Sequence, residues 1–256
     1  MSRSEPTPLR KWPDVLEAAL LPEEQWSSIH VLSETDSTQT AAVRMGVEDG
    51  GVTTTWRQRS GRGRRGKSWA DTADEGVAMT LTVAQEPSPH LSCAVAIGVI
   101  DAIADVANLS AAAKWPNDVL LNTRKVAGIL IEVRPGTGLL DIGIGVNVLQ
   151  EQWEGDLARS AISLLQAGAW CDPVAVLIAV ARCVQRALKM SKEDLTARWR
   201  RADVLIGRNV SIHSSGKETT GLVVETDPHR GLLLETPAGK SWFSASISTI
   251  VDHHLL

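Results

Sequence analysis

The sequence predicts an α+β fold, with a mixed, largely antiparallel sheet flanked by helices and a small C-terminal β-barrel. Two apolar stretches at helical spacing, residues 91–106 and 174–188, predict the main helices. Residues 126–133 and 139–148 have strand character and are joined by a P-G-T-G turn. So short a connection makes this pair antiparallel. From Gly207 onward, short strands alternate with turns, which predicts the barrel.

Length and composition indicate one large domain followed by a small one. The chain has 256 residues, and we expect a main domain over 1–206, including an N-terminal extension at 1–28, and the barrel over 207–256. The net charge is −4, so no global attraction to nucleic acid is expected. The three cysteines form no C-x-x-C motif, and neither a signal core nor a membrane span is evident. These features predict a cytoplasmic protein.

The first motif is T-D-S-T-Q at 35–39, which follows a short strand at 29–32 and precedes a helical segment. Asp, Ser and Thr are good helix N-cap residues, so a plain helix cap is the favoured interpretation. The alternative is that Ser37 and Thr38, together with the helix N-terminus, bind an anion or a polar head group.

The second motif is a basic, glycine-rich loop between strands predicted at 52–58 and 77–83. The loop contains five cations, Arg59, Arg62, Arg64, Arg65 and Lys67, interspersed with Gly61, Gly63 and Gly66. Cations and freed backbone N–H groups suit a phosphate chain, and the ring of Trp69 offers a face for a base. A solvated face or a nucleic-acid patch is the alternative. The G-x-G-x-x-G spacing does not indicate a dinucleotide fold, because a strand rather than a helix follows.

Two further segments point to a ligand. Residues 114–118, K-W-P-N-D, place Lys114 immediately before a turn. Gly143, Gly145 and Asn147 occupy one face of the strand at 139–148, because strand side chains alternate. A face without side chains could receive a flat ligand, and close packing of a helix is the equal alternative. A charged helix at 192–201 precedes the barrel strands, which are predicted at 208–214, 219–226, 231–236 and 241–243.

Together these segments resemble the biotin protein ligase family in residue pattern, order and spacing. The matching segments are T-D-S-T-Q at 35–39, Q-x-x-G-R-G-R-R-G-x-x-W at 58–69, K-W-P-N-D at 114–118, K-V-A-G-I-L-I-E at 125–132 and G-I-G-V-N at 143–147. The resemblance runs from residue 30 to the C-terminus and implies an SH3-like barrel after the catalytic domain. One departure is Gln39, where the family usually has Asn.

The resemblance implies an ATP-dependent ligase that makes biotinyl-5'-AMP and pyrophosphate, then transfers biotin to a lysine of a biotin carboxyl carrier domain. The residues before 30 are too few for the N-terminal repressor domain of some bacterial members, so the ligase-only form, without a DNA partner, is expected. Mg²⁺ would be bound mainly through the phosphates, with protein ligands unknown, and no tightly bound prosthetic group is implied. Neither a monomer nor a homodimer is excluded.

The resemblance also implies roles for individual residues. Lys114 and Arg64 would be catalytic. Contacts to biotin would come from Ser37, Thr38, Gln39, Gln58, Arg62, Gly63, Arg64 and Lys114. Contacts to ATP or the adenylate would come from Arg62, Arg64, Arg65, Lys67, Trp69, Asn117, Lys125 and Asn147.

Three other functions compete with this one. A lipoate or octanoate ligase has similar fold and chemistry, but the pairing of G-R-G-R-R-G with K-W-P-N-D disfavours it. A nucleic-acid-binding module is disfavoured by the net charge and by the absence of a wider basic stripe. A silent biotin-binding regulator is disfavoured by Lys114 and the complete loop.

Overall fold

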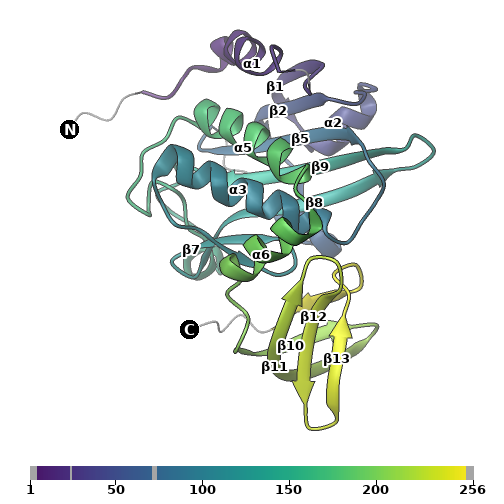
Figure 1. The fold of residues 1–256 in the computed structure, drawn as a ribbon. Helices are drawn as coiled ribbons and strands as arrows, with labels where there is room; N and C mark the ends of the chain where they lie inside the picture. Colours follow the sequence, from purple (N-terminus) through teal and green to yellow (C-terminus); the bar gives the residue numbers. More distant parts are fainter. Residues whose placement is uncertain (1–4, 24, 71–73, 252–256) are drawn as a thin grey trace.

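The main body of the protein is a seven-stranded mixed sheet. The computed structural model describes residues 5–23, 25–70 and 74–251 (Figure 1), so parts of the expected extension (1–4 and 24) and barrel (252–256) lie outside it. Only the edge pair β1–β2 is parallel, and the other neighbours are antiparallel. In spatial order the strands are β1 (Ser28–Thr35), β2 (Gly51–Gln58), β5 (Gly76–Ala84), β9 (Leu139–Asn147), β8 (Arg124–Arg134), β7 (Asp118–Leu121) and β6 (Ala112–Lys114).

Helices cover both faces of this sheet. The predicted apolar helices, α3 (Leu91–Ala107) and α5 (Pro173–Leu188), pack against each other and lie in front of the sheet in Figure 1. The short helix α2 (Thr38–Arg44) packs on β2, β5 and β9. Further helices are η1 (Leu9–Lys11), α1 (Trp12–Leu20), η2 (Arg64–Gly66), α4 (Leu157–Ser160) and α6 (Lys192–Ala202).

Strand alternation separates the core from the site. On β9, the apolar side chains of Ile142, Ile144 and Val146 belong to the hydrophobic core, together with buried residues of α3 and α5. Gly143 and Gly145 point to the other face, because successive residues of a strand face opposite sides. Helix α2 packs on this glycine face, because its Gln39 side chain lies against Gly143.

A second, five-stranded antiparallel sheet follows at the C-terminus, drawn in yellow and green at the bottom of Figure 1. Its strands, in spatial order, are β13 (Gly239–Phe243), β12 (Gly231–Thr236), β11 (Lys217–Asp227), β10 (Asn209–Ser214) and β14 (Ser248–Ile250). The prediction of a mixed sheet with helices and a small unit of C-terminal strands is confirmed. Five short strands were not predicted from the sequence, because each is only two to four residues long: β3 (Gly61–Arg62), β4 (Ser68–Trp69), β6, β7 and β14.

The described residues bear on two further expectations. No helix among them is long and apolar enough to cross a membrane. Cys93, Cys171 and Cys183 are free thiols, and all three are buried.

Candidate active site

The basic loop folds into a small hairpin. β3 (Gly61–Arg62) pairs antiparallel with β4 (Ser68–Trp69), and the one-turn helix η2 (Arg64–Gly66) joins them. Gly61 is needed because a Cβ at this position would lie 2.9 Å from the Trp69 carbonyl oxygen. The hairpin thus presents the arginines at its turn and Trp69 at its base.

The two arginines at the hairpin turn reach across to the segment that joins β13 to β14 of the C-terminal sheet, and to the start of β14. The Arg64 guanidinium donates to the carbonyl oxygens of Ala245 and Ser248, the latter at 3.4 Å, and to Asn117 Oδ1, also at 3.4 Å. Arg65 donates to the carbonyl oxygen of Ile247. Burial, and then the neighbouring Arg65, lower the pKa of Arg64 from its ordinary value. Carbonyl groups bear no net charge, so a phosphate would be a stronger acceptor for these cations.

Polar groups on α2, β2 and β5 form a second cluster beside the hairpin. Gln58 Oε1 accepts a hydrogen bond from the Thr38 backbone N–H at 2.9 Å, and Thr38 Oγ1 lies 3.4 Å from the same oxygen. Thr80 Oγ1 donates to Thr38 Oγ1 at 2.8 Å. Ser37 is the N-cap residue of α2, but its buried hydroxyl makes no capping hydrogen bond within the described chain. The predicted helix cap is thus confirmed in position, but Ser37 does not cap the helix through its side chain.

The glycine face of β8 and β9 is covered by side chains of the protein itself. The Gln39 amide lies over Gly143, where a Cβ would be 2.8 Å from its Oε1 atom. The Trp69 indole lies over Gly145 and Gly128, and a Cβ on Gly128 would be 3.0 Å from the ring. The side chains that approach these glycines are Gln39, from helix α2, and Trp69, from the hairpin. The packing of α2 on β9 agrees with the predicted alternative of a helix on this face, and the flat ligand stays a prediction.

An ion pair connects two of the sequence motifs. Lys125 Nζ lies 2.6 Å from Asp118 Oδ1 and 5.6 Å from the centre of the Trp69 ring. Asp118 is in turn the cross-strand neighbour of Lys114, the last residue of β6. The segments 114–118 and 125–132 therefore meet beneath Trp69. A half-exposed ion pair of 2.7 Å joins Arg62 of the hairpin to Glu132 on the same strand β8.

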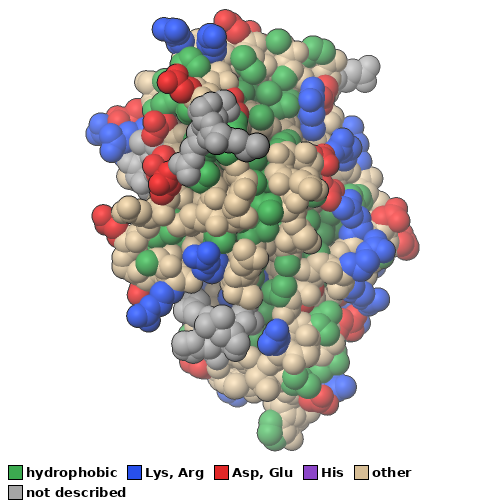
Figure 2. All heavy atoms as spheres, turned by 90° about the vertical axis from the view of Figure 1, so that its left-hand side faces the viewer, with side chains coloured by type: hydrophobic (Ala, Val, Ile, Leu, Met, Phe, Trp, Pro, Cys, Tyr) green, Lys and Arg blue, Asp and Glu red, His purple; other side chains and the backbone are tan. Residues whose placement is uncertain are grey.

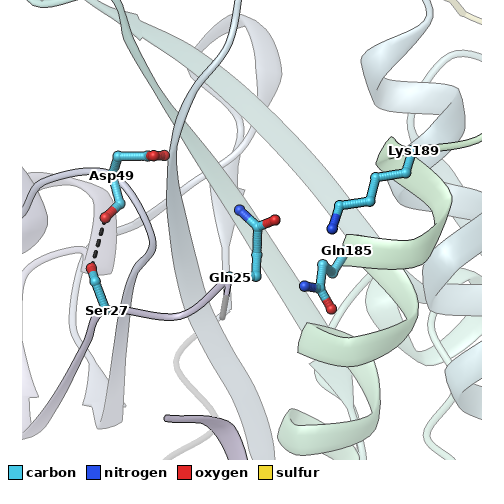
Figure 3. A pocket seen from close by; sticks show the side chains of 5 residues that line it. All are labelled: Gln25, Ser27, Asp49, Gln185 and Lys189. Atoms are coloured by element: carbon cyan, nitrogen blue, oxygen red, sulfur yellow. Dashed lines mark hydrogen bonds between the residues drawn. The ribbon is translucent and has the colours of Figure 1, made fainter. Parts of the chain in front are cut away.

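Other surfaces offer less chemistry. An open polar hollow lined by Gln25, Ser27, Asp49, Gln185 and Lys189 (Figure 3) includes none of the predicted site residues. On the face shown in Figure 2, acidic and basic side chains are interspersed. Among the described residues, no group of three His, Cys, Asp or Glu side chains could hold a metal ion.

Comparison with known proteins places this site in a family. The model of the biotin/lipoate A/B protein ligase family matches residues 31–148. The bifunctional ligase/repressor BirA of Escherichia coli is 31% identical over 238 residues, which are 86% of this chain and 74% of that protein. This chain belongs to the biotin protein ligase family.

Further relatives agree with the assignment to the biotin protein ligase family. The biotin–[acetyl-CoA-carboxylase] ligase of Mycobacterium tuberculosis is 30% identical over 227 residues, covering 82% of this chain and 84% of that protein. A solved structure of the Aquifex aeolicus biotin protein ligase, in complex with biotin and ATP, has a TM-score of 0.79 at 25% identity. That alignment covers 88% of this chain and 99% of the Aquifex chain.

The structure brings most of the residues predicted from the biotin ligase motifs to one side of the sheet, but it gives some of them unforeseen partners. Asn147 is buried, and its amide donates to the carbonyl oxygens of Lys125 and Ile162 at 3.2 and 3.1 Å. Gln39 Nε2 likewise donates to the carbonyl oxygens of Leu130 and Asp141 at 3.2 and 3.1 Å. Both amides thus leave only an oxygen for a ligand. Lys67 is exposed at the hairpin.

Sequence reasoning missed two groups at this site. Thr80 lies in the apolar strand β5 and is fully buried. A polar side chain within an apolar strand was the available sequence signal. The carbonyl groups of residues 245–248 had no signal at all, because every residue type carries the same backbone acceptor.

Proposed function

We propose that this chain converts biotin and ATP to biotinyl-5'-AMP and pyrophosphate, then transfers the biotinyl group to a lysine of a biotin carboxyl carrier domain. The observation that carries the proposal is the meeting of three motifs. Arg64 of the hairpin contacts Asn117, and Asp118 holds Lys125 under Trp69. Cations for phosphate and a ring for adenine thus lie beside the polar cluster of Thr38 and Gln58.

In the first step, a biotin carboxylate oxygen attacks the α-phosphorus of ATP, and the bond to the β-phosphate breaks. Two anions must meet and charge builds on the phosphate oxygens, so the demand on the protein is electrostatic. Lys114 would bridge the carboxylate and the α-phosphate as a fixed cation. Arg62, Arg64, Arg65 and Lys67 would bind the phosphates, with Lys125 and Trp69 at the nucleotide.

Biotin and magnesium complete the proposed site. The ureido ring would be held by Ser37, Thr38, Gln39 and Gln58, and by the backbone around Gly63. The two nearest carboxylates, Asp118 and Glu132, are each paired with a cation. This donor set fits an Mg²⁺ ion held mainly by phosphate oxygens, because Mg²⁺ commonly keeps its waters and few protein ligands. The ion would supply charge neutralisation on those oxygens.

In the second step, the amine of the acceptor lysine attacks the carbonyl carbon of the mixed anhydride, and AMP leaves. No nucleophile of the enzyme is required. The cysteines do not offer one, because burial raises the pKa of Cys93 and Cys171, and that of Cys183 to about 11. Three reduced thiols also suit the cytoplasm. We assign the catalytic domain to 1–206 and the C-terminal barrel to 207–256.

The direct test is biotin transfer. The protein is incubated with biotin, ATP, Mg²⁺ and an isolated biotin carboxyl carrier domain, and the mass of the carrier is measured. We expect one biotinyl group per carrier, lost when ATP is omitted or when the acceptor lysine is replaced by arginine. An unmodified carrier would contradict the proposal. Modification with lipoate in a parallel reaction would show that lipoate, and not biotin, is the substrate.

A further inference from the structure

Thr80 lies at the centre of the polar cluster, although no motif includes it. It is fully buried on β5, opposite Thr53 on β2 and Gly143 on β9. Opposed residues in an antiparallel sheet share a face, so Thr80 points to the same side as Gly143, toward α2. There its hydroxyl meets Thr38 Oγ1 at 2.8 Å.

Hydrogen-bond accounting fixes the direction of this chain of groups. The Thr38 backbone N–H can only donate, so the Gln58 atom 2.9 Å away is the amide oxygen. The single hydroxyl proton of Thr38 is directed to the same oxygen at 3.4 Å. Thr38 Oγ1 must therefore accept from Thr80. Three groups on three elements are ordered in one direction, from Thr80 through Thr38 to Gln58.

This direction determines what the cluster offers a ligand. Because Gln58 Oε1 is occupied, its Nε2 donor is turned outward, toward Gly61 of the hairpin, where it would lie 2.5 Å from an added Cβ. Thr38, with its proton committed, offers a lone pair. Gln39, whose Nε2 serves two backbone carbonyl groups, offers Oε1. One donor and two acceptors complement a cyclic urea, which has one carbonyl and two N–H groups.

We propose that Thr80 is a positioning residue that sets the hydrogen-bond direction of the biotin site and so its selectivity for a cyclic urea. The inference rests on the proposed function. Without the Thr80 donor, the Thr38 proton is free to turn away from Gln58, and the Gln58 amide loses one of the two bonds that fix its orientation. A site with mobile polar groups binds a polar ring more weakly.

The test compares three variants in biotin-dependent ATP–pyrophosphate exchange. Thr80→Val replaces the hydroxyl by a methyl group of similar size, and Thr80→Ser retains the donor. Thr53→Val is the matched control, because Thr53 is equally buried on the same cross-strand row but its Oγ1 has no hydrogen-bond partner among the described residues. Thermal unfolding and the KM for ATP are measured for each variant.

We expect Thr80→Val to raise the KM for biotin about tenfold, which corresponds to the loss of one buried hydrogen bond, with the KM for ATP unchanged. Thr80→Ser and Thr53→Val should stay near the wild-type values. In a Thr38→Val background, Thr80→Val should add little, because the two residues act through one bond.

The outcomes separate this inference from the proposed function. An unchanged biotin KM in Thr80→Val, or an equal rise in Thr53→Val or Thr80→Ser, overturns the role of Thr80 while wild-type exchange still supports the ligase. Absence of biotin-dependent exchange in the wild-type protein instead rejects the proposed function, and with it this inference.

Discussion

At the residue scale, Arg64 connects more of the molecule than any motif suggested. From the turn of the hairpin it contacts Asn117 of the K-W-P-N-D segment and the carbonyl groups of the C-terminal sheet. A guanidinium group can make these bonds together because its donors form a planar fork. We propose that Arg64 uses these contacts to close the hairpin over a bound adenylate.

Replacing Arg64 by glycine should release the hairpin from its contacts with Asn117 and the C-terminal sheet. We expect Arg64→Gly to retain measurable adenylation but to release free biotinyl-adenylate, because the intermediate is no longer enclosed. The measurement is chromatography of the reaction mixture without acceptor. Arg59→Gly is the matched control, since the Arg59 side chain forms an exposed ion pair with Glu34 at 2.7 Å, a kind of contact that contributes little. Normal adenylation by Arg64→Gly with no free adenylate would contradict this role.

The sequence predicted which segments meet at the candidate site, whereas the contacts of their individual residues could not be predicted. The basic loop and Lys114 were found because their composition is unusual at their positions. The partners of Arg64 in the C-terminal sheet lie 181 and 184 residues away and are backbone atoms, which no side-chain pattern can mark. The backbone partners of the Gln39 and Asn147 amides could not be predicted for the same reason, because they are carbonyl groups of β8, β9 and the segment after α4.

At the element scale, β9 shows what strand periodicity can and cannot predict. Alternation placed Gly143 and Gly145 on one face, and the structure confirms that something lies close to both. The Trp69 indole over Gly145 comes from the distant hairpin, so the approaching group depends on tertiary packing. The longer strands and helices were predicted by local pattern, whereas the three-residue strand β14, which pairs with β10, is too short to carry one.

The contact between β9 and the hairpin gives a stability prediction. In Gly145→Ala the new methyl group overlaps the Trp69 indole, so the ring must move or the strand must shift. We expect a loss of about 1–3 kcal/mol in the free energy of unfolding, the usual cost of overpacking. Urea denaturation measures it.

A Trp69→Ala background is the control for this substitution. With the indole absent, Gly145→Ala should cost much less, which a double-mutant cycle detects as a coupling energy. Equal costs in both backgrounds would show that the indole does not lie on Gly145.

At the scale of the whole molecule, several contacts among the described residues hold the C-terminal sheet to the main body, and three of them illustrate how. One is the pair of hairpin arginines described above. The second is a buried hydrogen bond of 3.0 Å from Trp199 Nε1 on α6 to Thr226 Oγ1 on β11. The third is the contact of His90, at the start of α3, with His229, whose ring centres are 4.8 Å apart. The C-terminal sheet therefore contacts both the helices of the main body and the hairpin of the candidate site.

The histidine contact should make the attachment of this sheet sensitive to acid. Burial, and then His229, lower the pKa of His90 below its ordinary value of 6.5. The unfolded chain therefore binds the proton more tightly than the folded chain does. Stability from this group is complete above about pH 6.5 and falls as the pH drops below it.

We expect the melting temperature of the wild-type protein to fall more between pH 7 and pH 5 than that of His90→Asn. The substitution removes the titrating ring and retains a polar group near Ser88, whose hydroxyl lies 2.6 Å from His90 Nδ1. Differential scanning fluorimetry at matched ionic strength measures both slopes. Parallel slopes for the two proteins would show that His90 does not couple protonation to folding.

The most direct test of the central claim is ATP–pyrophosphate exchange with biotin, lipoate and octanoate in parallel, with and without Lys114→Ala. We predict exchange with biotin alone, reduced about 10²–10³-fold by Lys114→Ala, as for removal of a transition-state donor. Lys189→Ala, in the polar hollow of Figure 3, should leave the rate unchanged. Exchange with lipoate or octanoate instead would overturn the substrate, and full exchange in Lys114→Ala would contradict the role of the bridging cation.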